Sequence, residues 1–191
     1  MELLEKYLSE NFNLSPSELE LIFSFHKVVH LKKGDFFINQ GVTCRHTGFL
    51  AEGLMRYFEF DKDGNDPTCY FTYPPHYILD PFTFFEQNPA VTNAQAVTNC
   101  TLLKMSYNDH QHLSREFSRW ETISRELVMK LGLEFSNQKT LLSLNAKDRY
   151  AYFEEKYPQV ALEAPLQYVA TYLGMAVPSL SRIRKNRMVK G

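Results

Sequence analysis

Cysteine is scarce in this chain, and its three cysteines lie far apart. Cys44, Cys69 and Cys100 form no CxxC pair, which argues against a Cys-rich metal or iron–sulfur site and indicates a reducing compartment. The sequence also lacks a signal segment, a long apolar run, a low-complexity stretch and a long-period repeat. We therefore expect a cytoplasmic protein with no membrane partner.

The chain as a whole carries almost no net charge, but its two parts carry net charges of opposite sign. The formal net charge is −1 over 191 residues. From residue 146 onward there are eight basic and four acidic residues, so the first 145 residues carry −5. Apolar residues make up 44% of the chain, which is enough for a core. These figures predict a basic nucleic-acid-binding module joined to a mildly acidic domain.

The stretch 166–185 carries two short helical patterns around a glycine. Apolar residues share one face of each: Val169, Ala170 and Leu173 in the first, Leu180 and Ile183 in the second. Gly174 stands where a tight corner needs positive φ, and Pro178 falls in the first turn of the second helix. This spacing is typical of a helix-turn-helix, although an ordinary helix corner shares it.

Basic residues follow at once and favour the DNA-binding interpretation. The segment 182–190 holds five basic residues and no acidic one, namely Arg182, Arg184, Lys185, Arg187 and Lys190. Phosphate binding requires such an unopposed positive surface.

Short strands punctuated by glycine dominate the first half. Residues 1–27 read as helix, with a capping signal at Ser15 to Glu18. From residue 28 to 105, many short apolar runs alternate with Gly, Asn and Asp turns. This regular spacing predicts a β-barrel or jelly roll.

One long apolar stripe then marks a helix over roughly 107–144. Its residues recur at steps of three and four: Trp120, Ile123, Leu127, Leu131, Phe135, Gln138 and Leu142. We expect this stripe to be a dimer seam, and the alternative is that it only covers the β domain. Residues 145–147 look like a hinge.

Three motifs in this order resemble one family. LKKGDFFINQG (31–41), AEGLMRYF (51–58) and LGMAVPSLSRIRK (173–185) are similar to segments of the cyclic-AMP-receptor and fumarate–nitrate-reduction (CRP/FNR) regulators. The resemblance implies an α+β fold with an N-terminal cyclic-nucleotide-binding-like β-roll (jelly roll) flanked by helices, a long dimerisation helix and a C-terminal helix-turn-helix. We expect an effector domain over 1–114, a dimerisation helix over 115–144 and a DNA-binding domain over 145–191.

The same resemblance implies a function and partners. It predicts a homodimeric transcription regulator, not an enzyme, that binds a pseudo-palindromic operator in double-stranded DNA, with RNA polymerase as a further candidate partner.

The effector site departs from the family pattern. Cyclic-nucleotide binders of the family carry Gly-Glu and a later Arg, where this chain has Leu79, Asp80 and Ala90. No Lys or Arg occurs between residues 64 and 100, and a buried cyclic phosphate needs a charge partner. We expect no cyclic AMP and no cofactor; an apolar or aromatic ligand and a filled, ligand-free pocket both stay open. The degenerate pocket comprises Asp80, Pro81, Phe82, Thr83, Ala90 and Val91.

The DNA end matches the family better. The resemblance places Arg182 where an Arg can bridge O6 and N7 of guanine. The other candidates for base reading are Ser179, Ser181 and Val177, and those for phosphate contact are Gln167, Arg184, Lys185 and Arg187.

Two further classes of function are weighed against this one. A cupin-like metalloenzyme would need clustered His and Glu; His46, Glu52 and His76 are present without an HxH motif. His110 and His112 do form HxH, but on a helix such residues point apart. A cyclic-nucleotide-like sensor or interaction module without DNA binding would not need the basic C-terminal helix.

Overall fold

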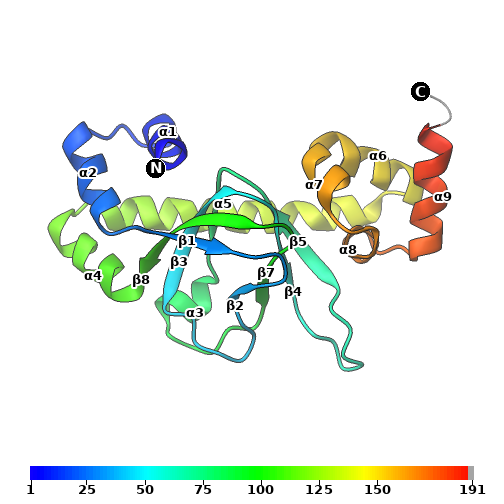
Figure 1. The fold of residues 1–191 in the computed structure, drawn as a ribbon, viewed down its shortest axis with the longest axis horizontal. Coiled ribbons are helices and arrows are strands. Elements are labelled where there is room, and N and C mark those ends of the chain that lie inside the picture. The colour runs from blue at the N-terminus through cyan, green and yellow to red at the C-terminus, as the bar shows by residue number, and fades with distance from the viewer. Residues whose placement is uncertain (189–191) are drawn as a thin grey trace.

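A computed structural model describes residues 1–188, except for the side chains of 134–140 and 188. Within this range, two four-stranded antiparallel sheets form a β-roll (Figure 1). One sheet has the order β1 (Lys27–Leu31), β8 (Cys100–Ser106), β3 (His46–Glu52), β6 (His76–Ile78). The other has the order β2 (Phe36–Ile38), β7 (Asn93–Ala96), β4 (Met55–Phe58), β5 (Thr68–Thr72).

Apolar side chains from both sheets fill the interior of the roll. Phe37, Leu50, Met55, Tyr57 and Leu102 are among the buried members of this core. The predicted β-roll is thus confirmed. Gly53, between β3 and β4, has φ +92°, and a side chain there would strike the backbone of Asn99 and Cys100.

Helices flank the roll on the side of the N-terminus. They are α1 (Glu2–Asn11), α2 (Pro16–Ser24) and α4 (Tyr107–Glu116), and α3 (Pro81–Phe85) lies between β6 and β7. The predicted capping signal is real: the Ser15 hydroxyl accepts from the Glu18 amide, and the Glu18 carboxylate accepts from the Ser15 amide.

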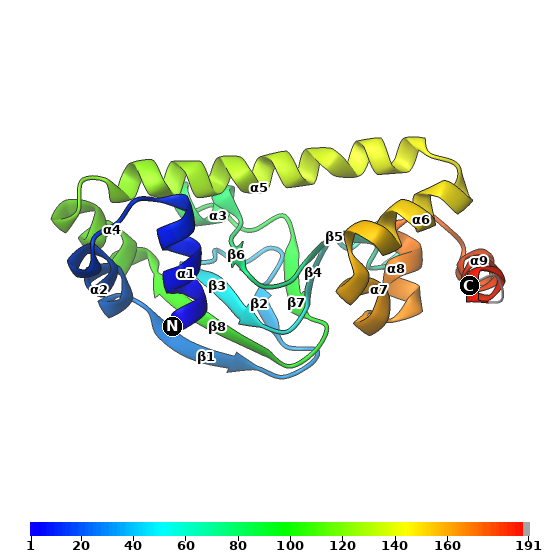
Figure 2. The same cartoon turned by 90° about the horizontal axis from the view of Figure 1, so that it is seen from above.

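The helix α5 (Trp120–Ser143) runs along one long side of the molecule and reaches the C-terminal helices (Figure 2). The first four residues of its apolar stripe are buried within the chain itself. Trp120, Ile123 and Leu127 pack with α1, α2 and the roll, and Leu131 packs against Leu79 and Phe84. These four side chains, expected at a dimer seam, are therefore already covered by the chain's own residues. The side chains of Phe135 and Gln138 lie outside the described residues, and Leu142 is 43% exposed.

Four helices make the C-terminal part: α6 (Ala146–Lys156), α7 (Pro158–Glu163), α8 (Leu166–Tyr172) and α9 (Val177–Met188). The expected hinge at 145–147 is the start of α6, where the Asn145 side chain accepts from the Asp148 amide. Phe153, Val160 and Leu180 share one core with Leu54 and Phe71 of the roll. The C-terminal helices are thus packed against the edge of the β-roll.

Candidate nucleic-acid interface and its link to the β-roll

The corner between α8 and α9 is built as the apolar spacing predicts. Val169, Ala170 and Leu180 are buried, so the inner faces of both helices meet in one core. Gly174 has φ +61°, and its amide donates to the Thr171 carbonyl at 3.0 Å. This glycine ends α8 and lets α9 begin close to it.

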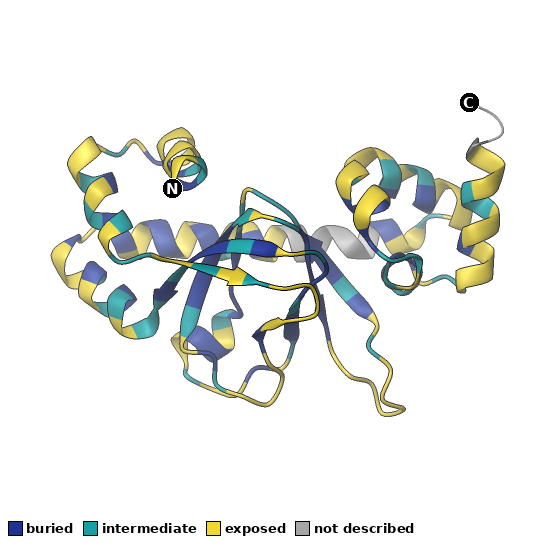
Figure 3. Cartoon of the chain, in the orientation of Figure 1, coloured by how far each residue is buried: buried dark blue, intermediate teal, exposed yellow. Residues whose placement is uncertain are grey.

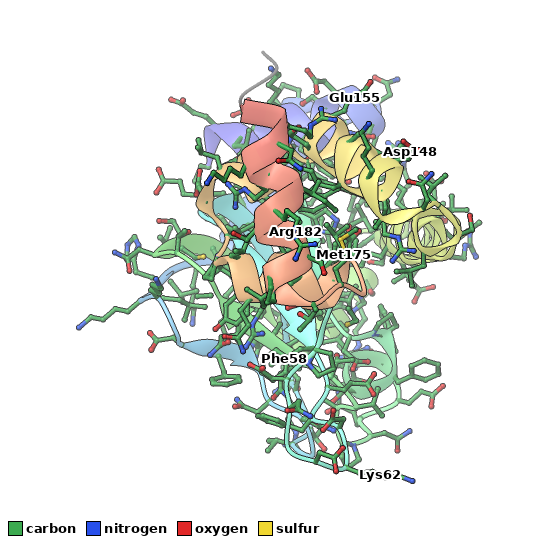
Figure 4. All side chains as sticks on the ribbon, turned by 90° about the vertical axis from the view of Figure 1, so that its right-hand side faces the viewer. Phe58, Lys62, Asp148, Glu155, Met175 and Arg182 are labelled. Atoms are coloured by element: carbon green, nitrogen blue, oxygen red, sulfur yellow. The ribbon has the colours of Figure 1, made fainter. Side chains whose placement is uncertain are left out.

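The outer face of α9 is open to solvent. Val177, Ser179, Ser181 and Arg182 are exposed, as Figure 3 shows for most of this helix. Arg182 makes no hydrogen bond or ion pair with any described residue, and in Figure 4 it lies on the face of α9 turned toward the viewer. All four predicted base-reading residues are therefore accessible to solvent.

The predicted phosphate contacts divide into two groups. Gln167 on α8 and Lys185 on α9 are exposed. Arg184 is half-buried and donates to the Ala161 carbonyl at 3.3 Å. Arg187 forms an ion pair with Glu154 on α6 at 3.0 Å. The second group thus stabilises the packing of α9 on α6 and α7, which sequence patterns did not indicate.

Arg56 on β4 links this helical part to the roll. Its side chain is only 1% exposed, and its guanidinium donates to Gln95 at 2.9 and 3.1 Å and to the Asp66 carboxylate at 2.5 Å. The same group lies 4.1 Å from the Phe58 ring centre and 3.6 Å from that of Tyr168 on α8. A cation inside the apolar strand LMRYF was the only sequence signal for this contact.

Two more contacts fix α8 to β5. The Thr68 amide donates to the Thr171 hydroxyl at 3.1 Å. The Phe71 and Tyr172 rings meet edge to face, with centroids 5.3 Å apart. Because α8 supports α9, these contacts set the orientation of the exposed basic face relative to the β-roll (Figure 1).

The six residues of the expected degenerate pocket occupy both buried and exposed positions. The Asp80 carboxylate caps α3 by accepting from the amides of Phe82 and Thr83, and the Thr83 hydroxyl accepts from the Cys44 amide at 2.8 Å. Asp80, Thr83 and Ala90 are buried, Pro81 is half-buried, and Phe82 and Val91 are exposed. Asp80 and Thr83 therefore have structural roles around α3.

The histidines considered as metal ligands lie in different environments. His46 bonds the Phe37 carbonyl at 3.0 Å, whereas His110 is buried between α4 and α5 and His112 is exposed. Over the residues that the structure describes, no three His, Cys, Asp or Glu side chains lie together as a metal site.

No described helix combines the length and apolar character that a membrane crossing requires.

Comparison with known proteins agrees with the observed fold. Residues 28–117 match the family model of the cyclic nucleotide-binding domain. FixK2 from Bradyrhizobium japonicum is 13% identical, with a TM-score of 0.76 over 87% of this chain and 86% of that one. No curated protein sequence gives a significant match.

Two further structures have the same arrangement. The catabolite activator protein of Thermus thermophilus is 21% identical, with a TM-score of 0.59 over 94% of this chain and 86% of that one. A transcriptional regulator of the CRP/FNR family from Eubacterium rectale is 15% identical, with a TM-score of 0.70 over 94% of this chain and 86% of that one. The class defined by the fold is therefore the cyclic nucleotide-binding β-roll with flanking helices. The predicted resemblance to the CRP/FNR regulators is thus confirmed at the level of the fold.

Proposed function

We propose that this chain is a homodimeric, DNA-binding transcription regulator whose β-roll does not take cyclic AMP. The observation that carries the proposal is the exposed face of α9, which is basic at Arg182 and Lys185 and stands next to the tight corner after α8. A helix presented in this way on a helix-turn-helix fits the major groove. The regulators of similar fold support the same conclusion.

Each residue of this face has a distinct proposed role. Arg182 reads guanine through O6 and N7, and Ser179, Ser181 and Val177, exposed on the same helix, are candidates for further base contacts. Lys185 and Gln167 bind phosphates. Arg184 and Arg187 add positive charge near the backbone while they keep their bonds to α7 and α6.

The proposed loss of cyclic-AMP binding rests on two observations. The roll interior is packed with the chain's own aromatic and aliphatic side chains. The segment 64–100, which holds the residues of the degenerate pocket, has no Lys or Arg to pair with a phosphate.

We place the proposed dimer contact on the outer face of α5. Met129 is 62% exposed and Leu133 is 67% exposed, although both are large and apolar. Gly132 lies between them with open space above it, so a second helix can approach closely. These three residues, spaced by three and four, form an apolar strip on the side of α5 opposite Ile123 and Leu127.

A charge placed in this strip is expected to separate the protomers. In a two-fold dimer each substitution occurs twice, so the double variant Met129→Glu/Leu133→Glu buries four unpaired carboxylates. We expect the dimer dissociation constant to rise by about 100-fold or more, measured by sedimentation equilibrium. Leu162→Glu, at an exposed apolar position on α7, is the control. An unchanged dissociation constant in the double variant would exclude this surface as the dimer contact.

DNA binding itself is tested by the salt dependence of binding. Genomic fragments retained by the purified protein are identified, and their affinity is measured over a range of salt concentrations. We expect Lys185→Ala to weaken all sequences alike and to lower the slope of log affinity against log salt by about one unit. Lys62→Ala, at the exposed hairpin after β4 and far from α9 in Figure 4, should leave the slope unchanged. Failure to retain any fragment would contradict the proposed function, and a loss confined to one sequence would contradict the phosphate role of Lys185.

A further inference from the structure

Three buried polar atoms on α4 and α5 have no partner among the described residues. His110 is 5% exposed, and its Nε2 bonds the Ser124 hydroxyl at 3.1 Å. Its Nδ1 has no partner among the described residues, and the same holds for Nε1 of Trp120 and Oγ of Ser114. Buried polar groups are nearly always hydrogen-bonded in native proteins, so three such atoms call for a group that meets them.

A cleft lies beside this cluster. It has a volume of about 400 Å³ and is lined, among others, by Phe85, His110, Ser114, Ser124, Val128 and Met129. A much smaller hollow continues inward to Trp120 and Leu79. Phe85, His110, Ser124 and Val128 line both spaces. A shift of the partly exposed Phe85 ring would therefore join them and open the polar atoms to the cleft.

The chemistry of the walls selects one class of ligand. Burial lowers the pKa of His110 to about 4, so the imidazole is uncharged at neutral pH. The rings of Phe84, Phe85 and Trp120 surround it, with centroids 5.4, 5.6 and 6.0 Å away. The only charged groups lining the cleft, among the described residues, are Glu121 and Arg125 on the exposed face of α5. Aromatic walls with a few inward polar groups favour a flat, neutral molecule.

We propose that the cleft between α4 and α5 binds a small uncharged aromatic molecule with a hydrogen-bonding edge. Trp120 Nε1 donates to an acceptor on that edge, and His110 Nδ1 and Ser114 Oγ bond the same edge. Phe85 moves aside to admit the ligand and then packs against the ligand's ring. This site is separate from the degenerate pocket that contains Asp80 and Ala90. Met129 belongs both to the rim of the cleft and to the proposed dimer strip, so the ligand would bear on the dimer contact. That last link rests on the proposed function, whereas binding at the cleft does not.

The chain's only tryptophan reports directly on this site. The ¹⁵N-labelled full chain is titrated with benzamide, phenol and indole, and the single indole N–H resonance of Trp120 is followed by NMR. We expect at least one of these probes to shift that resonance saturably, because an acceptor meets Nε1 in the complex.

Variants of the two histidines on α4 separate binding from folding. His110→Phe keeps the ring and removes its nitrogens, and we expect it to weaken probe binding by about tenfold or more. His112→Phe, at an exposed position on the same helix, should leave binding unchanged. If His110→Phe does not fold, Ser114→Leu serves as the test in its place. It fills the cleft from a less buried position and should abolish the shift. The proposal is overturned if none of the three probes shifts the Trp120 resonance saturably. It is also overturned if affinity survives in whichever of His110→Phe and Ser114→Leu folds.

Discussion

Replacing Arg56 by alanine is expected to lower the free energy of unfolding by about 3–5 kcal/mol. The side chain is buried, and its donors are satisfied by Gln95, Asp66 and Thr68. Removing it leaves the Gln95 and Asp66 oxygens without their partner and empties the space between the Phe58 and Tyr168 rings. Unsatisfied polar atoms and a cavity both destabilise the folded state.

The same substitution should loosen α8 specifically, because Arg56 is the only charged side chain shown stacking on a ring of α8 within the described range. Hydrogen exchange of α8 amides should therefore accelerate more than that of α1, which lies well apart from α8 in Figure 1. Chemical denaturation measures the loss of stability.

Two control variants define the Arg56 experiment. Arg119→Ala removes a half-exposed arginine paired with Glu18 at 3.1 Å and should cost less than about 1 kcal/mol. Arg56→Lys keeps the charge but not the planar fork, so its effect should fall between wild type and Arg56→Ala. A loss of less than about 1 kcal/mol for Arg56→Ala, or equal acceleration of exchange in α1 and α8, would contradict a link between β4 and α8.

Local patterns predicted the elements well because local physics determines them. The Ser15 to Glu18 signal became a capping box, and Gly174 took the positive φ that a tight corner needs. Pro158 opens α7 directly after the end of α6, since proline is favoured at a first helical position. The break between α4 and α5 at 117–119 had no strong turn signal and was not predicted.

Contacts between distant segments could not be predicted in this way. Steps of three and four on α5 show that one side of the helix is covered, but not whether the cover is a partner or the chain's own core. The structure shows Ile123 and Leu127 in the chain's own core. The contacts of Arg56 and His110 could not be predicted for the same reason, because their partners come from other elements and no spacing rule connects them.

Arg182→Ala is expected to have the largest effect on DNA binding. A bidentate contact from arginine to guanine contributes about 1–3 kcal/mol of discrimination. A two-fold dimer on a pseudo-palindrome makes this contact in both half-sites, so the loss on the specific operator is about 2–6 kcal/mol, or roughly 30-fold to 25,000-fold in affinity. Arg182 is exposed and has no partner among the described residues. Folding stability should therefore change by no more than about 0.5 kcal/mol.

Competition between operators distinguishes a base reader from a phosphate contact. Binding of Arg182→Ala should fall on the selected operator, change little on random DNA, and tolerate any base at one position of each half-site. Lys185→Ala is the matched control on the same helix, since it should weaken both kinds of DNA equally. Unchanged affinity of Arg182→Ala for the protein's own operator would remove Arg182 as the base reader. An equal loss on operator and random DNA would make it a phosphate contact, and α9 would then read sequence through Ser179, Ser181 and Val177 alone.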